Sequence, residues 1–157
     1  MSEDLAADGV ARATRTTFRL ECGVAVWVDA PPERIWDLLT DAARFTEWNT
    51  TVSRMEGRIE EGGRLTIETP SAPGRVFRPK VSRVEPGRAM VWSDGMAPMF
   101  RGVRTFTLAP RDGGTELRMV EVLSGLMLPL IAGSLPDFVP IFATYAADLK
   151  RAAERAG

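Results

Sequence analysis

Residues 26–49 read VWVDAPPERIWDLLTDAARFTEWN, and this stretch indicates the fold more directly than any other part of the chain. A strand-like run ends where Pro31-Pro32 interrupts it. An amphipathic helix is predicted over 32–39, because a proline at an early helical position and apolar residues on one side are typical of a helix start. A second short helix, with Asp41 as its N-cap, is predicted to end at Trp48-Asn49. A strand followed by two short aromatic-rich helices indicates a sheet with a lid over an internal pocket.

The composition is that of an ordinary globular chain, with 157 residues, 45% of them hydrophobic and 26% charged. This length fits one domain, which we expect at 16–157 after a flexible leader at 1–15. The formal net charge of -1 gives no electrostatic footprint for nucleic acid. No apolar stretch reaches the roughly 18 residues that span a bilayer, and the N-terminus lacks a signal-peptide pattern. We therefore expect no integral membrane segment, no nucleic-acid partner and a cytoplasmic location.

The chain contains no histidine and one cysteine, Cys22. The lack of histidine removes Ser-His-Asp and Cys-His catalysis, as well as histidine-ligated zinc, iron and haem. Neither a metal nor a cofactor is expected. Acid–base chemistry would have to come from Asp, Glu, Tyr, Lys, Cys or water. Cys22 lies in an apolar strand pattern, which favours a small buried side chain over a reactive thiol.

The order of the predicted elements indicates how the chain folds. A first strand at 17–28 and the two short helices precede a series of strands, and a long amphipathic helix at 134–153 closes the chain. The later strands are predicted at 52–58, 64–69, 76–84, 89–93, 101–108 and 115–123. An antiparallel sheet must bury one face, and the closing helix is the only large partner available. We expect the sheet to curl around this helix and to leave an internal cavity.

Short motifs along the chain occur in an order that points to a known superfamily. They are VDAPPERIW at 28–36, LTD at 39–41, WN at 48–49, VWS at 91–93, FTL at 106–108, GGTEL at 113–117, VE at 120–121, SGL at 124–126 and AADLK at 146–150. Together they resemble START-like helix-grip proteins of the SRPBCC superfamily, in its polyketide cyclase/dehydrase and lipid-transport branch. The resemblance spans about 18–153. It implies an α+β helix-grip fold with a curved antiparallel sheet of about seven strands around a long C-terminal helix, and two short helices after the first strand.

The resemblance implies a class of function but not one activity, because members of this superfamily include cyclases, aromatases and lipid carriers. We expect the chain to bind a small hydrophobic, aromatic or polyketide-like molecule in the internal cavity. One hypothesis is an enzyme that cyclises or dehydrates this molecule. The alternative is a non-catalytic carrier or sensor of a lipid or another hydrophobic ligand. A third hypothesis is an interaction module that uses residues 96–100 and 125–133. The ligand is the expected partner, and a homodimer is left open.

Arg104 and Glu121 are candidate catalytic residues because of their strand positions. If Phe106 faces the interior, alternation along a strand puts Arg104 on the same face, and Glu121 shares a face with Met119 in the same way. The short turn between these strands makes them neighbours. An inward Arg and Glu could orient a polar group of the substrate, and a desolvated Glu could act as acid or base. The alternative is a structural ion pair at the rim of the sheet.

Tyr145, the only tyrosine, is the third candidate catalytic residue, since a hydroxyl on an apolar helix face needs a partner. With Arg104 it could handle protons and enolate charge; otherwise it is a core residue with its oxygen at the edge.

The candidates for the ligand-binding lining are mostly large and apolar, and their alternative role is core packing or, for Asn49, a turn. They are Trp48, Asn49, Phe77, Met90, Trp92, Met96, Met99, Phe100, Phe106, Phe138 and Phe142.

Overall fold

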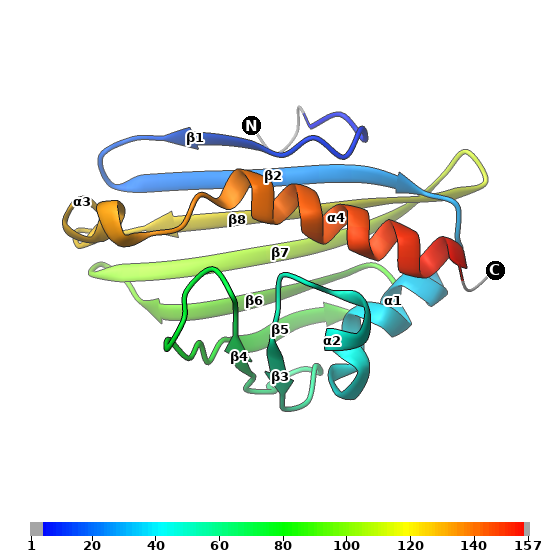
Figure 1. The fold of residues 1–157 in the computed structure, drawn as a ribbon, viewed down its shortest axis with the longest axis horizontal. Helices are drawn as coiled ribbons and strands as arrows, with labels where there is room; N and C mark the ends of the chain where they lie inside the picture. The colour runs from blue at the N-terminus through cyan, green and yellow to red at the C-terminus, as the bar shows by residue number, and fades with distance from the viewer. Residues whose placement is uncertain (1–4, 156–157) are drawn as a thin grey trace.

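A six-stranded antiparallel sheet forms the frame of the molecule, in the order β1-β2-β8-β7-β6-β5 (Figure 1). The structure is a computed structural model that describes residues 5–155. The strands of the large sheet are β1 Arg12–Arg15, β2 Arg19–Val28, β5 Lys80–Glu85, β6 Ala89–Met96, β7 Phe100–Arg111 and β8 Gly114–Ser124. A second, two-stranded sheet pairs β3 Arg54–Glu56 with β4 Thr66–Glu68.

The helices lie on one face of the large sheet. They are α1 Pro32–Thr40, the short 3-10 helix η2 Ala42–Arg44, α2 Phe45–Trp48, α3 Leu128–Ile131, the 3-10 helix η3 Ala132–Ser134 and α4 Phe138–Arg155. Figure 1 shows α4 running along β2 and β8, with α1 and α2 near its C-terminal end and α3 beyond its N-terminal end. The α+β class, the long C-terminal helix and the two short helices after the first long strand are confirmed.

The inner face of the sheet is the face that α4 covers, and strand alternation selects its residues. On the four central strands the inward side chains include Val24, Val26, Met90, Trp92, Phe106, Leu108, Leu117 and Met119, all buried. From α4, the buried side chains are Phe142, Tyr145, Ala146, Asp148, Leu149, Ala152 and Ala153. Burying a large apolar side chain contributes roughly 1.5–3 kcal/mol, so this layer is the main source of stability.

A tight turn sets the register of β7 and β8, the two longest strands. Arg111 pairs with Gly114, which leaves Asp112 and Gly113 as a two-residue loop. Both loop residues have positive φ, 51° and 81°, as the type I′ hairpin turn requires. This register places Arg104 directly opposite Glu121.

Some boundaries differ from those predicted. In the predicted leader, Arg12–Arg15 form β1 on the edge of β2, and Leu5 and Ala11 are buried. Residues 1–4 of that leader and 156–157 of the predicted domain lie outside the described residues. Residues 94–100 form the tip of the β6–β7 hairpin, because strand pairing continues to Met96 opposite Phe100.

The helix ends also differ in detail. The closing helix begins at Phe138 rather than at 134, where η3 occupies the chain instead. Asp137 caps it, since its Oδ1 accepts a hydrogen bond from the Val139 backbone N–H at 3.1 Å. Asp41 makes no side-chain cap hydrogen bond to the short helix after it, so the predicted cap is wrong. Within residues 5–155, no helix by itself is long and apolar enough to cross a membrane.

The β7–β8 turn can be tested with a pair of matched glycine variants. Gly113 and Gly133 both have open space where a Cβ would lie, but only Gly113 has a positive φ. We expect Gly113→Ala to lower the free energy of unfolding by about 1 kcal/mol, because an L-residue is strained in the left-handed region. Gly133→Ala should leave it unchanged or slightly raised. Denaturant unfolding measures both; equal effects would contradict the role of φ at the turn.

Candidate functional site

A polar row crosses the middle of the inner face. Cys22 on β2 pairs with Glu121 on β8, Glu121 with Arg104 on β7, and Arg104 with Trp92 on β6. The next row toward α1 is entirely apolar. It consists of Val24, Met119, Phe106 and Met90. The charged side chains are therefore held by the strands themselves, next to a closely packed apolar layer.

Arg104 and Glu121 form an ion pair on this face, as their strand positions suggested. The Arg104 Nε donates to Glu121 Oε1 at 2.9 Å, and the side chains retain 20% and 17% exposure. The guanidinium carbon lies 5.0 Å from the centroid of the Phe142 ring and 5.7 Å from that of Tyr145. Burial opposes the charge on Arg104, but the Glu121 carboxylate outweighs this and raises the pKa of Arg104. The guanidinium therefore stays charged.

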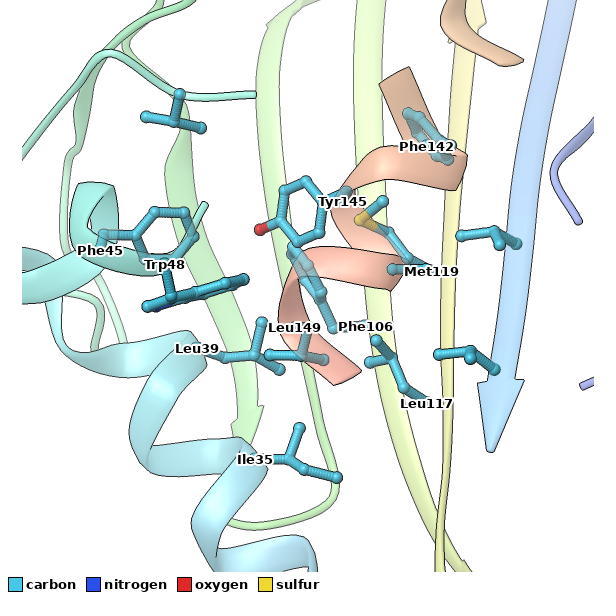
Figure 2. Close-up of a cluster of buried hydrophobic side chains, with 14 of the residues drawn as sticks. Ile35, Leu39, Phe45, Trp48, Phe106, Leu117, Met119, Phe142, Tyr145 and Leu149 are labelled. Atoms are coloured by element: carbon cyan, nitrogen blue, oxygen red, sulfur yellow. The ribbon is translucent and has the colours of Figure 1, made fainter. Parts of the chain in front are cut away.

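Aromatic rings close the interior beside this ion pair. Tyr145 on α4 is at the centre, with its ring centroid 6.3 Å from Phe45, 6.0 Å from Trp48 and 6.2 Å from Phe106. The Phe106 ring is in turn 4.8 Å from that of Trp92. Figure 2 shows α2 contributing Phe45 and Trp48 from one side and α4 contributing Tyr145 from the other. The seam between α2 and α4 is thus lined by rings.

Three buried polar atoms at this seam and on β6 have no hydrogen-bond partner among the described residues. They are the Tyr145 hydroxyl, the Asn49 Nδ2 and the Trp92 Nε1. The Tyr145 hydroxyl points away from α4 toward Phe45 and Trp48 (Figure 2). Burial raises the pKa of Tyr145, and Arg104 and Asn49, which are close enough to act as donors toward its hydroxyl oxygen, offset part of this effect. Neither contact has the geometry of a hydrogen bond, so the hydroxyl counts as unpartnered. Tyr145 therefore remains a protonated phenol at neutral pH. A fourth such atom, Glu21 Oε2, belongs to a strand residue that alternates onto the outer face.

A buried carboxylate attaches the turn after α2 to α4. Asp148 is 4% exposed, and its Oδ2 accepts hydrogen bonds from the Thr50 backbone N–H at 2.8 Å and from the Thr50 hydroxyl at 2.7 Å. Arg151 donates to the other oxygen at 3.2 Å. The neighbouring Asn49 uses its Oδ1 to accept from the Thr51 backbone N–H and hydroxyl, at 3.0 and 2.7 Å. These bonds hold Asn49 against Tyr145.

The sequence analysis did not single out Asp148 as a residue of the site. The available signal was its spacing, since Asp148 follows Tyr145 by one helical turn and precedes the buried Leu149. Cys22 was interpreted correctly as buried. Burial, and then the nearby Glu121 carboxylate, raise the pKa of its thiol to about 11, so the thiol stays neutral.

One surface pocket lies at the N-terminal end of α4, with a volume of about 270 Å³. It is lined by Ala13, Arg15, Leu20, Leu128, Ala132, Leu135, Pro136, Asp137 and Phe138. Leu20 lies two positions before Cys22 on the same face of β2, next to the polar row. The Phe138 ring is 6.3 Å from that of Phe142, which stacks under Arg104. Phe138 and Phe142 therefore separate this pocket, which we call the α4 pocket, from the ion pair.

A second pocket, of about 390 Å³, lies on the outside between α1, α2 and the end of α4. Its lining is Arg34, Asp37, Leu38, Asp41, Arg44, Glu47, Trp48, Ala152 and Arg155. Most of these side chains are charged, and only Trp48 also belongs to the aromatic seam. We therefore interpret this larger pocket as a solvated groove between helices.

The structure brings most of the predicted site residues together. Those on the inner face or at the seam are Trp48, Asn49, Met90, Trp92, Arg104, Phe106, Glu121, Phe142 and Tyr145. Phe77 and Phe138 are partly buried and pack against the core. Met96 and Met99 lie instead at the β6–β7 hairpin tip with 77% and 50% exposure, and Phe100 is half-buried beside them. Phe45, which was not predicted, belongs to the seam.

The site offers no arrangement of ligands for a metal ion. Within residues 5–155, no three or more Cys, Asp or Glu side chains are grouped so as to hold one. Its chemistry is that of one ion pair, neutral hydrogen-bond donors and aromatic rings.

Comparison with known families agrees with this architecture. Residues 8–156 match the family described as Polyketide cyclase / dehydrase and lipid transport. The chain belongs to this family. A comparison with curated proteins gives no match.

Solved structures of similar fold include several bacterial proteins. A Rhodobacter sphaeroides protein is 20% identical, with a TM-score of 0.66 over 94% of this chain and 99% of that one. A Mesorhizobium loti protein is 26% identical, with a TM-score of 0.61 over 87% and 98%. DynU16, described as a protein in the dynemicin biosynthetic locus, is 20% identical, with a TM-score of 0.63 over 85% of this chain and 47% of its own. At such identities the likeness supports the shared fold.

The attachment of the turn to α4 can be tested at Asp148. We expect Asp148→Ala to lower the free energy of unfolding by about 2–3 kcal/mol, because the Thr50 N–H and hydroxyl lose a charged acceptor in a buried place. The exposed Asp37→Ala on α1 is the control and should change it by less than about 0.5 kcal/mol. Denaturant unfolding of both variants is the measurement. Similar small effects would show that the turn does not depend on Asp148.

Proposed function

We propose that this chain binds a small hydrophobic, aromatic or polyketide-like molecule between the sheet and α4, beside the Arg104–Glu121 ion pair. One observation carries the proposal: three buried polar atoms lack partners in an interior lined by aromatic rings. Leaving a buried donor unpaired costs roughly 1–3 kcal/mol, and a bound molecule would remove part of that cost. The family supports hydrophobic ligand binding in general.

The ligand reaches the polar row through the α4 pocket. The pocket, at about 270 Å³, is slightly smaller than the roughly 300–1,000 Å³ of typical ligand sites. It would enlarge toward Arg104 if the rings of Phe138 and Phe142 moved aside. Phe138 is only partly buried, which makes its ring the easier of the two to displace. Arg104 and Glu121 are themselves not fully buried, which supports their being within reach of a molecule that enters from outside the core.

Binding can be followed by NMR through the indole N–H signals of the tryptophans. We expect isopropylnaphthalene, a pure hydrocarbon probe, to shift the signal of Trp92, which lies in the polar row. Trp27 is the internal control, because its N–H donates to the Arg111 carbonyl at 2.8 Å, away from the site. A probe that shifts no indole signal, or shifts only that of Trp27, would contradict binding in the interior.

Entry of the ligand through the α4 pocket can be tested with a pair of tryptophan variants. Leu20→Trp should fill the α4 pocket and weaken binding of the probe at least tenfold, whereas Leu130→Trp, on the exposed side of α3, should not. Thermal melting of both variants checks that they fold. Equal affinities would contradict entry through this pocket.

We also propose a specific activity, in which the chain cyclises or dehydrates the molecule that it binds. The Arg104 guanidinium and the Tyr145 hydroxyl would stabilise developing enolate charge, and the Glu121 carboxylate would accept a proton. Tyr145 acts as a donor and not as a base, because its raised pKa keeps it protonated. DynU16, which shares the fold, is described as a protein in a biosynthetic locus, and this supports a role in making a small molecule.

An enzyme and a carrier can be distinguished by measuring substrate turnover and ligand affinity in the same variants. With a poly-carbonyl substrate that the chain converts, Glu121→Gln should lower turnover by about 100-fold or more while the affinity for isopropylnaphthalene changes little. Arg104→Ala should also lower turnover, through loss of charge stabilisation. If both variants bind and turn over like the parent, the assigned chemistry is wrong. If the parent binds poly-carbonyl compounds and converts none, the chain is a carrier.

A further inference from the structure

We propose that the ligand is held by a neutral carbonyl oxygen, which accepts hydrogen bonds from the Asn49 amide and the Tyr145 hydroxyl, with the Trp92 indole as a further donor. This inference rests on the proposed function, since it concerns the same interior site. It adds the chemical class of the ligand: an apolar, ring-sized skeleton that carries a ketone, ester or similar carbonyl group.

The orientation of the Asn49 amide is fixed by its other contacts. The Thr51 backbone N–H can only donate, so the amide atom 3.0 Å away must be the oxygen, Oδ1. The Thr51 hydroxyl occupies the same oxygen at 2.7 Å. The NH₂ group is therefore the part of the Asn49 amide that is left buried without a partner. What Asn49 offers to a ligand is a pair of N–H donors.

Tyr145 and Trp92 add donors of the same kind. An indole N–H can only donate, and the Tyr145 hydroxyl keeps its proton because burial raises its pKa. Among the groups that act on the Tyr145 hydroxyl, Asn49 and Arg104 carry only donors on the side that faces it. The Glu121 carboxylate acts on it only through its charge, and it is already paired with Arg104. Even if Asn49 donated to the Tyr145 oxygen, the hydroxyl hydrogen would still need an acceptor. Donors thus outnumber acceptors at the seam, and the group that completes it must accept hydrogen bonds.

The charges at the site favour a neutral acceptor over a carboxylate. Arg104 is already paired with Glu121 at 2.9 Å, so the two charges compensate each other. A carboxylate ligand would add an uncompensated negative charge to a largely buried site, next to the existing Glu121 charge. A carbonyl oxygen accepts the same hydrogen bonds without this cost. We therefore assign the site to a neutral carbonyl compound.

Three naphthalenes that differ only in one substituent separate these possibilities. Acetylnaphthalene carries the carbonyl, isopropylnaphthalene is its isostere without the oxygen, and naphthoate is the anion. We expect acetylnaphthalene to bind about tenfold more tightly than isopropylnaphthalene, in keeping with the net value of one or two hydrogen bonds to buried donors. In NMR spectra the Trp92 indole proton should move further downfield with acetylnaphthalene than with isopropylnaphthalene.

Variants then test the donors individually. Tyr145→Phe removes only the hydroxyl, and Asn49→Asp keeps the oxygen that Thr51 needs while replacing the NH₂ donor. Each should reduce the preference for acetylnaphthalene over its hydrocarbon isostere by about threefold, since the two donors together account for a preference of about tenfold. Tyr145→Phe should leave the affinity for isopropylnaphthalene unchanged. The control is Thr144→Val, which removes a hydroxyl from the exposed side of the same helix and should change neither affinity.

The outcomes distinguish this inference from the proposed function. If acetylnaphthalene and isopropylnaphthalene bind equally well, the ligand is not recognised through a carbonyl, whereas hydrophobic binding in the interior stands. A preference for naphthoate would also overturn the inference, in favour of an anion bound by Arg104. If the preference for acetylnaphthalene survives both Tyr145→Phe and Asn49→Asp, these residues are not the donors. Failure of all three probes to bind would contradict the proposed function itself.

Discussion

The structure depends on the burial of one face of a six-stranded sheet by very few covering elements. A single long helix, α4, lies along β2 and β8, and it cannot also cover the strands on the far side. The short α2 and the β3–β4 sheet complete the cover, with Met55 and Ile67 buried in the same core and Phe45 reaching the Trp92 ring on β6 at 6.2 Å. Because separate elements cover the two halves of the sheet, a seam remains between α4 and α2. The unpartnered polar groups of Asn49 and Tyr145 lie at that seam, so the candidate site is a consequence of how the sheet is covered.

The Arg104–Glu121 ion pair is poorly explained by stability alone. Removing two charges from water costs several kcal/mol per ion, and apolar residues of similar size often serve a buried core as well or better. The pair retains partial exposure, which lowers this cost and also limits what it contributes to folding. Its place between the Phe142 ring and Cys22, facing α4, suits a group that must meet a ligand. This placement agrees with the ligand-facing role proposed for the ion pair.

The parts that the sequence predicted are those that local rules determine. Alternation along two strands and the turn at Asp112-Gly113 were sufficient to place Arg104 beside Glu121. The contact between Asp148 and Thr50 joins residues 98 positions apart, and no local pattern indicates it. The apolar composition of residues 96–100 could not show whether a covering element exists, and Met96 is in fact exposed at a hairpin tip. The sequence showed that Tyr145 places a hydroxyl on an apolar helix face. Its lack of a hydrogen-bond partner depends on how α2, α4 and the sheet pack together, which no local pattern indicates.

The same charges also constrain how the site could carry out a reaction. With no histidine in the chain, Glu121 is the acidic side chain that faces Arg104 and could accept a proton from a bound ketone. Protonation of Glu121 would release Arg104 at the moment when the ligand becomes an enolate. Arg104 would then pair with the enolate oxygen, so the total charge of the interior would stay constant through the step. In a medium of low dielectric this exchange of partners avoids the cost of creating an isolated charge. A carrier needs only the donors of Asn49 and Tyr145; an enzyme needs this exchange as well.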